Sequence, residues 1–320
     1  MQRRPVRLTL ESMSETPVFD LQAYSQALTK WIGRAGEHVV AVSAAAYRVS
    51  SGVVFRDGLI AVNSHALRRE GKIPVTLPDG SETQAAIIGR DPSVDTAILQ
   101  TEPGRAAAAI PEDDPQALQA GTLAVVVGRT LDAGLSASVG ILGAVAGPRR
   151  TWRGGTLSRF LRLDVNLYPS QAGAAVISPA GKLIGMATGA MSRHSALAIP
   201  VDTLDRIADE LLKEGRIRRG YLGVGLQPVS IPEHLRSKSS LVGEIGLMVL
   251  SVEPGAGAEE AGIQLGDILV AAGGASIGET EGLQDLLRSA VDSKLKITLL
   301  RAGQLIEVDV PISERPPRRA

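Results

Sequence analysis

Short apolar runs separated by glycine and other turn residues follow one another from residue 39 to residue 199. Many short strands separated by turns indicate an all-β barrel or sandwich. Asp57-Gly58 and Asp79-Gly80 are dipeptides typical of hairpin turns. The expected strands are residues 39–42, 52–55, 59–62, 73–77, 86–88, 96–99, 123–127, 139–145, 161–165, 175–177, 183–186 and 196–199.

A connector rich in alanine and proline, residues 106–115, divides these strands into two series. This division favours two consecutive β-barrels. The chain has 320 residues, of which 44% are hydrophobic but only 3% aromatic. The cores must therefore be built from Val, Ile, Leu and Ala side chains.

Two helices flank the predicted barrels. Residues 21–32 carry apolar side chains at irregular helical spacing, and Gly33 is expected to end that helix. Residues 202–214 form the clearer helix, with Gly215 as its stop and Asp209 and Lys213 as a pair four residues apart. Its expected apolar face consists of Val201, Leu204, Ile207, Leu211 and Leu212.

The residues after Gly220 alternate between the two kinds of element, which predicts a smaller α+β domain. Residues 246–252 and 268–270 read as strands, and residues 258–262 and 281–290 as helices. Residues 295–300 and 305–310 form a hairpin around Gly303.

Composition excludes several classes of function. The formal net charge is zero, so no broad basic surface is available for nucleic acid. The absence of cysteine excludes disulfides, thiol catalysis and zinc held by cysteine. No cofactor and no metal site is predicted.

Neither terminus predicts a membrane segment. Arg3, Arg4 and Arg7 precede a short apolar stretch that ends at Glu11, whereas a secretory signal needs about 7–15 apolar residues there. No run approaches the ~18 apolar residues of a membrane span. We therefore expect a cytoplasmic protein from the sequence as written, and a periplasmic one if a signal has been trimmed. The basic residues 315–319 are expected to be a solvated tail.

Two polar residues stand at strand ends in the first predicted barrel. The segment Asn63-Ser64-His65 follows the strand 59–62 directly, which places His65 where a cleft could lie, and Asp95 opens the buried-looking strand 96–99. A buried carboxylate needs a hydrogen-bonding partner. Taken singly, His65 also fits a surface or packing histidine, and Asp95 a turn or capping aspartate.

Together, residues 59–65, 75–80 and 89–99 resemble the first barrel of HtrA-type (Deg-type) serine proteases, which have the trypsin fold. In that family a histidine is the general base, and an aspartate orients it and supports the imidazolium that forms. The resemblance places His65 and Asp95 at these two positions and implies a trypsin-like double β-barrel.

The family's nucleophile segment reads Gly-Asn-Ser-Gly-Gly-Pro, and its flanks resemble residues 163–169 and 176–185 of this chain. This register puts Ala172 at the serine position. Acyl transfer needs an oxygen nucleophile beside the base, and a methyl group cannot attack. Ser170 and Gln171 fall on the loop that supplies the oxyanion hole in the family. The matching segment is Ser170-Gln171-Ala172-Gly173-Ala174-Ala175.

Three interpretations of Ala172 remain open. The site has been lost naturally, as the other changes in the segment favour, or an active endopeptidase is represented by an inactivated variant. Ser170 could alternatively serve as a substitute nucleophile, but it lies two residues early on a tightly shaped loop.

The second domain resembles a PDZ module in residues 253–263 and 265–269, which follow a junction at residues 218–224. The resemblance implies that Tyr221-Leu222-Gly223-Val224 offers backbone N–H groups to the carboxylate of a peptide C-terminus. Leu222, Val224, Leu283 and Leu287 are the expected pocket for the last side chain. The alternative is that Leu222 and Val224 are core residues and that Tyr221 or the protease domain closes the groove.

These inferences predict an N-terminal segment 1–36, a trypsin-like domain 37–200, a linker helix 201–220, a PDZ domain 221–313 and a tail 314–320. The predicted function is binding of peptide segments or C-termini in protein quality control by an inactive protease homologue. The alternatives are an active serine endopeptidase and a purely structural subunit. The resemblance implies unfolded proteins or peptide C-termini as partners, and a homo-trimer or a mixed HtrA oligomer as the assembly.

Overall fold

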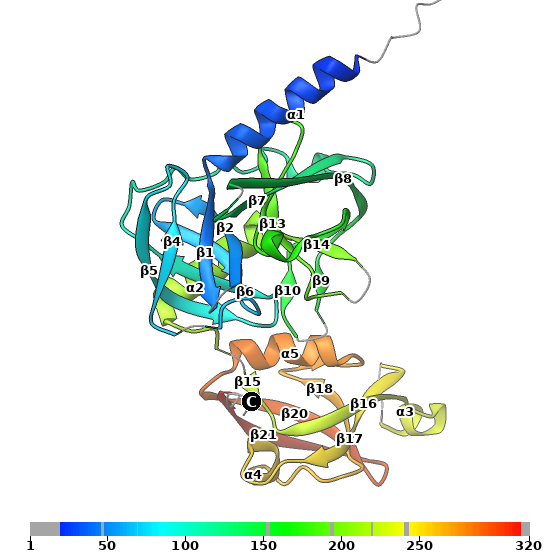
Figure 1. The fold of residues 1–320 in the computed structure, drawn as a ribbon. Coiled ribbons are helices and arrows are strands. Elements are labelled where there is room, and N and C mark those ends of the chain that lie inside the picture. The colour runs from blue at the N-terminus through cyan, green and yellow to red at the C-terminus, as the bar shows by residue number, and fades with distance from the viewer. Residues whose placement is uncertain are drawn as a thin grey trace, which may run out of the picture.

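The computed structural model describes residues 20–45, 48–68, 70–132, 134–151, 154–192, 195–218, 220–239 and 243–314. Two closed β-barrels lie side by side, and a separate sheet with its own helices lies below them in Figure 1. The predicted fold class, a mainly β double barrel followed by a helix and a PDZ-like sheet, is confirmed. Arg3, Arg4, Arg7 and the basic residues 315–319 lie outside the described residues.

The first barrel closes in the strand order β1-β2-β3-β6-β5-β4. Buried aliphatic side chains fill it, among them Ile60, Ile73 and Leu99. β3 pairs with β6 in a register that puts Asn63 opposite Thr96, so the residues that follow β3 meet those that precede β6. The strands are β1 (Val39–Ala45), β2 (Arg48–Arg56), β3 (Leu59–Asn63), β4 (Lys72–Thr76), β5 (Glu82–Asp91) and β6 (Thr96–Gln100).

The second barrel closes in the order β11-β14-β13-β12-β7-β8. Its interior is again aliphatic, as the composition required, with Leu142, Leu161 and Ala198 buried. A short ribbon of β9 (Arg149–Arg150) and β10 (Thr156–Leu157) stands apart from the barrel. The barrel strands are β7 (Leu123–Thr130), β8 (Gly134–Ala146), β11 (Phe160–Asp164), β12 (Ala175–Ile177), β13 (Leu183–Thr188) and β14 (Ala196–Pro200).

Helix α2 (Val201–Glu214) follows β14 directly and ends at Gly215, whose φ of 70° is the left-handed cap expected there. Leu204, Ile207 and Leu211 are buried in a cluster that both barrels share. Leu212 is 50% exposed, so its assignment to the apolar face was wrong. The buried stripe follows a spacing of three and four residues, and Leu212 lies just beyond it.

The expected pair of Asp209 and Lys213 is also absent from the described contacts. Asp209 accepts a hydrogen bond of 2.5 Å from Arg56 at the end of β2, and Lys213 lies 3.7 Å from Glu214. Arg56 also donates to Asp205 at 2.6 Å. A tertiary contact between the barrel and the helix therefore replaces the local one, and it lowers the pKa of the Asp209 carboxyl through the hydrogen bond from Arg56.

Helix α1 (Leu21–Gly36) begins after Asp20, whose carboxylate caps the backbone N–H groups of Gln22 and Ala23. The prediction that Gly33 ends this helix was wrong. The helix continues because its last turn packs on the second barrel, where Ala35 and Gly36 are buried. The Arg129 side chain holds that end by donating to the Gly36 carbonyl at 2.7 Å.

The C-terminal sheet has the strand order β15-β21-β20-β18-β17-β16, with β19 beside β18. Helix α5 covers one face, and Leu247, Leu269 and Ile297 form the core beneath it. β16 and α3 were not predicted from the sequence. The elements are β15 (Gly220–Tyr221), β16 (Val224–Ser230), α3 (Glu233–Ser239), β17 (Ile245–Val252), α4 (Gly257–Glu260), β18 (Ile268–Ala272), β19 (Ala275–Ser276), α5 (Thr280–Ser289), β20 (Ser293–Arg301) and β21 (Gln304–Glu314).

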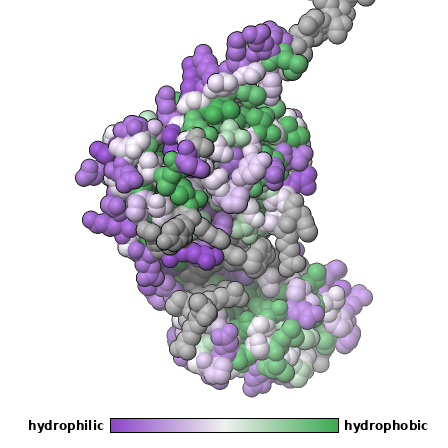
Figure 2. Space-filling view, in the orientation of Figure 1, coloured by the Kyte–Doolittle hydropathy of each residue, from purple (hydrophilic) through white to green (hydrophobic). Residues whose placement is uncertain are grey.

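The surface of the molecule is mixed. Figure 2 shows hydrophilic side chains along α1 and apolar atoms gathered over β8, where Val139 is exposed. The ribbon β9-β10 lies directly above α5 in Figure 1, and Arg150 donates a hydrogen bond of 2.9 Å to Gln284. Among the helices of the described residues, none is both long enough and apolar enough to cross a membrane.

Candidate functional site

His65 and Asp95 meet where β3 ends and β6 begins. The His65 Nδ1 atom lies 2.9 Å from Oδ1 and 2.8 Å from Oδ2 of Asp95, and the His65 backbone N–H donates to Oδ1 at 3.0 Å. The expected contact between the two side chains is therefore present. Since Nδ1 faces the carboxylate, the other ring nitrogen of this half-exposed imidazole points away from Asp95.

The local backbone holds Asp95 in a sparsely populated conformation. Its φ is 52°, in the left-handed region that aspartate tolerates better than most residues. Its carbonyl accepts hydrogen bonds from the Ser64 N–H at 3.1 Å and from the Asn63 side-chain amide at 3.4 Å. This arrangement buries the carboxylate and turns it towards His65.

Thr188 completes the environment of the carboxylate from the other barrel. Its hydroxyl donates to Asp95 Oδ2 at 2.5 Å and accepts a hydrogen bond from the Ala190 N–H at 3.1 Å. Because the Thr188 oxygen accepts the bond from Ala190, its single hydroxyl proton is free to be donated to Asp95. Thr188 was not predicted from the sequence, because a threonine at the end of a buried strand carries no sign of a contact across two barrels.

The loop that contains Ala172 is folded on itself. Residues Pro169–Gln171 form a 3-10 turn, in which the Gln171 N–H donates to Tyr168 O at 2.8 Å. The Ala172 N–H donates to Pro169 O at 3.3 Å. An oxyanion hole needs backbone N–H groups aimed at the substrate. At position 172 that group is instead bonded within the loop.

Gln171 anchors this loop in the second barrel. Its side chain is buried, and its amide nitrogen donates to the hydroxyls of Ser138 at 3.0 Å and Ser136 at 3.3 Å. Its side-chain oxygen accepts from the Tyr168 N–H at 3.2 Å. The sequence predicted Gln171 on the loop, but these partners on β8 were not predicted.

Ser51 on β2 joins the same loop to the first barrel. Its hydroxyl donates to Ser170 O at 2.7 Å, and its backbone N–H donates to Ala172 O at 2.9 Å. Gly173 has a φ of 82°, and an added Cβ there would lie 2.2 Å from the Ser51 carbonyl oxygen. Only glycine fits so close a contact. The loop is thereby pressed against β2, with Gly173 beside the backbone of Asn63.

The loop predicted to receive a peptide carboxylate, residues 221–224, runs from β15 to the start of β16. The Leu222 carbonyl accepts from the Ala258 N–H at 3.0 Å, and the Gly223 carbonyl accepts from the Glu253 N–H at 2.8 Å. Gly223 has a φ of 78°, and an added Cβ would overlap Ala256. These contacts fix the conformation of the loop.

The expected pocket residues come together, but mostly as core. Leu222, Leu283 and Leu287 are buried in the cluster beneath α5, and Val224 lies half-buried at its margin. Tyr221 is part of β15 and pairs with Ser313 on β21. The structure therefore places α5 beside the start of β16, with an apolar floor between them.

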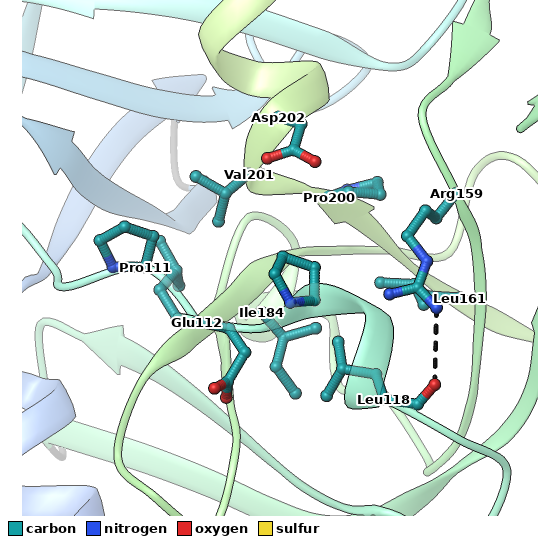
Figure 3. Close-up of a pocket in the computed structure, with 11 residues that line it drawn as sticks. Pro111, Glu112, Leu118, Arg159, Leu161, Ile184, Pro200, Val201 and Asp202 are labelled. Atoms are coloured by element: carbon teal, nitrogen blue, oxygen red, sulfur yellow. Dashed lines mark hydrogen bonds between the residues drawn. The ribbon is translucent and has the colours of Figure 1, made fainter. Parts of the chain in front are cut away.

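A small pocket of about 20 Å³ lies away from all of these residues, between the second barrel and the first turn of α2 (Figure 3). Pro111, Pro200 and Asp202 line it, and Arg159 reaches its edge, where the guanidinium lies 3.5 Å from the Leu118 carbonyl. Its position gives it no part in chemistry at His65.

The chain matches two family models. The model of the trypsin-like peptidase domain matches residues 50–186, and the model of the PDZ domain matches residues 248–301. The first covers parts of both barrels, and the second covers the centre of the C-terminal sheet.

Similar proteins align with this chain over most of its length. Serine endoprotease DegS of Haemophilus influenzae is 28% identical over 279 residues, which are 84% of this chain and 78% of DegS. A DegP-like serine endoprotease of Chlamydia pneumoniae, described as periplasmic, is 29% identical over 281 residues, and the match spans only 56% of that protein. The solved structure of the HtrA-type protease AlgW with a decapeptide matches 92% of this chain and 99% of its own with a TM-score of 0.73; at 22% identity this likeness shows the fold. The chain is therefore a homologue of the HtrA-type serine endoproteases, with a trypsin-like domain followed by a PDZ domain.

Proposed function

We propose that this protein binds peptide segments, above all free C-termini, and does not cleave them through a serine nucleophile. The observation that carries the proposal is Ala172 at the position where the family resemblance places the serine. His65 and Asp95 then form a base and its orienting carboxylate with no hydroxyl at that position to activate.

The loop around Ala172 supports this proposal independently of its side chain. The Ala172 N–H donates to Pro169 O, and the Ser170 carbonyl accepts from the Ser51 hydroxyl. The Gln171 side-chain amide is buried against β8. An enzyme that stabilised an oxyanion here would need donors aimed outward instead. Removing one such donor typically lowers kcat by about 10²–10³-fold.

Incubation with casein and with a serine-reactive fluorophosphonate probe tests the absence of protease activity. We expect no peptide release above a buffer blank and no labelled serine. The same protein with His65→Ala is the matched control, because any true serine-protease activity must fall in that variant. Cleavage or labelling that depends on His65 would contradict the proposal.

The PDZ domain supplies the binding activity. The carbonyls of Leu222 and Gly223 are occupied by Ala258 and Glu253, so the N–H groups of this turn face the opposite side. Such a turn is a small anion nest that suits a terminal carboxylate. The similar solved structure of the HtrA-type protease AlgW with a decapeptide supports a peptide as the ligand.

Titration with peptides that end in Val, Leu or Phe tests this binding, each peptide with a free and an amidated C-terminus. We expect affinities in the micromolar range for free C-termini, because one short strand and one anchor must overcome the cost of ordering the peptide. Equal binding of amidated peptides would exclude capture of the carboxylate.

A second candidate function is endopeptidase activity, with this chain as a nucleophile-to-alanine variant. The intact hydrogen bonds of Asp95 to His65 and Thr188 favour it, since a simple serine replacement leaves them in place. The coding sequence at position 172 distinguishes the two, because a serine codon there restores the enzyme interpretation.

The assembly and compartment follow from the resemblance alone. A homo-trimer is predicted, and light scattering should then give about three times the chain mass of 33.4 kDa. A monomer that assembles only with another HtrA subunit would favour the mixed oligomer. The relative described as periplasmic favours that compartment, and unfolded proteins there are the proposed partners.

A further inference from the structure

Strand β16 forms one edge of the C-terminal sheet and contains a proline. In the strand order it pairs with β17 on one side, and its other side is the end of the sheet. Pro228 lies in the middle of this strand, opposite Leu247. Proline has no backbone N–H, so its position decides which hydrogen bonds an added strand can make.

The register shows which residues of β16 face the open edge. The Ile231 N–H donates to Glu244 O at 2.8 Å, so in this antiparallel pair every second residue before Ile231 also bonds towards β17. Those residues are Val229 and Gln227. Leu226 and Pro228 alternate with them and direct their backbone polar groups outward.

Bonds of β17 on its other side confirm this orientation. The Val249 N–H donates to Asp267 O at 2.8 Å, and the Val249 carbonyl accepts from Gly266 at 2.9 Å. Val249 lies opposite Leu226 and is therefore turned away from it.

A bulge in the pairing of β16 with β17 leaves unchanged the alternation of inward-facing and outward-facing residues along β16. The register shifts between Gly225 and Leu226, and the Glu253 N–H donates to Gly223 O at 2.8 Å. Gly223 and Gly225 thus face β17, and Val224 faces outward. The outward positions, counted from the turn at Leu222–Val224, are Val224, Leu226 and Pro228.

We propose that Pro228 restricts recognition to about the last four residues of a peptide. This inference rests on the proposed capture of a C-terminal carboxylate by the turn at Leu222–Val224. A peptide that runs antiparallel to β16 from that turn advances two residues for each outward position. Its last residue lies at Val224, its third from last at Leu226, and its fifth from last at Pro228.

The hydrogen-bond ladder between β16 and the added peptide strand is complete at Leu226 and incomplete at Pro228. Leu226 can both donate to and accept from the peptide, whereas Pro228 offers only its carbonyl. The carbonyl of the fifth residue from the peptide end consequently finds no donor on β16. Pro228 also opposes pairing of this edge with the same strand of a second copy, which favours a short peptide as the occupant.

A peptide length series tests the proposal on the full chain. Peptides with one common C-terminal sequence and lengths of three, four, five, seven and ten residues are titrated against the wild type and Pro228→Ala. We expect wild-type affinity to rise up to four residues and then to change by less than about twofold. In Pro228→Ala the seven-residue peptide should bind about two- to tenfold more tightly than the four-residue one, as one added hydrogen bond allows.

The matched control is Gln227→Ala, which alters the neighbouring side chain but no donor at the open edge. The affinity of Gln227→Ala should reach the same plateau at four peptide residues as that of the wild type. Thermal unfolding confirms that each variant is folded, and Pro228→Val provides the same restored donor if the alanine variant is unstable. A wild-type affinity that keeps rising beyond four residues, or an identical plateau in both proline variants, overturns this inference while leaving carboxylate capture intact. Absence of any binding that depends on a free carboxylate overturns the proposed function and this inference with it.

Discussion

Ala172 lies in a loop whose backbone is bonded to itself, and the family resemblance places it at the nucleophile position. The Ala172 N–H is bonded to Pro169 O at 3.3 Å, and the resemblance places Ser170 where the family has glycine. We therefore expect Ala172→Ser alone to restore little casein hydrolysis. The pair Ala172→Ser with Ser170→Gly should be faster, because glycine lets the loop turn an N–H towards the substrate.

Hydrolysis and fluorophosphonate labelling are measured on both variants, with His65→Ala added to each as the control. Activity that survives the loss of His65 comes from another source. Turnover at the level of an active HtrA protease from Ala172→Ser alone would contradict the idea of a degenerate loop and favour the inactivated-enzyme interpretation.

The residues of the candidate site that lie at strand ends could be predicted from the sequence. The residues that join the site through contacts between the two barrels could not. His65 and Asp95 follow and precede paired strands, so their contact was accessible to sequence reasoning. Thr188 reaches Asp95 from the second barrel, and Ser51 reaches Ser170 from the first. No local pattern marks either contact, because the two barrels meet only in three dimensions.

At the scale of elements, apolar runs predicted all twelve strands of the two barrels, whereas interruptions concealed β16 of the C-terminal sheet. β16 contains Gly225 and Pro228, which weaken a strand pattern, and only its place at a sheet edge makes the proline acceptable. Helix α1 continues past Gly33 because its last turn is buried on the second barrel, where Arg129 donates to the carbonyls of Gly36 and of Val39 in β1, both at 2.7 Å. Burial lowers the pKa of that guanidinium, which still carries its charge.

The ion pair between β20 and the loop before β18 predicts a pH dependence of stability. Arg301 donates to both carboxylate oxygens of the buried Asp267, at 2.8 and 2.7 Å. Burial by itself raises the pKa of Asp267, but the bonds from Arg301 and the Gln264 N–H outweigh it and lower the pKa below its ordinary value. A lowered aspartate pKa stabilises the fold above the unfolded value of about 3.9, and this contribution is lost as the pH falls through the folded value.

Asp267→Asn should consequently unfold at a lower temperature than the wild type near neutral pH, and the difference should narrow as the pH falls below about 4. Thermal unfolding of the full chain followed by circular dichroism at a series of pH values measures this difference. Glu307→Gln is the control, because its pair with Lys296 is exposed and should matter little at any pH. A difference that stays constant or widens in acid would rule out the ion pair as its source.

At the scale of the whole molecule, the barrels and the C-terminal sheet are joined by α2 and by a polar contact. Arg218 lies in the linker and pairs with Asp292, and Arg216 pairs with Glu314 at 2.9 Å, so the linker is tied to the PDZ domain. The sequence predicted the order of these units from their motifs. It could not predict how they dock, because the contact between Arg150 and Gln284 depends on β9, a strand of two residues without any periodic pattern.

The contact between Arg150 and Gln284 is expected to restrict domain motion without stabilising the fold appreciably. A partly exposed hydrogen bond of this kind contributes about 1 kcal/mol or less, and domains joined by small polar contacts move relative to one another by default. We therefore expect Arg150→Ala and Gln284→Ala to increase the radius of gyration and the maximum dimension in small-angle X-ray scattering, while thermal unfolding shifts by only a few degrees. Arg162→Ala is the matched control, because that arginine donates to the Gly143 carbonyl at 3.0 Å within the second barrel. It should leave the scattering unchanged. If both contact variants scatter like the wild type, the ribbon does not hold the PDZ domain, and its orientation must be set by the linker pairs of Arg216 and Arg218.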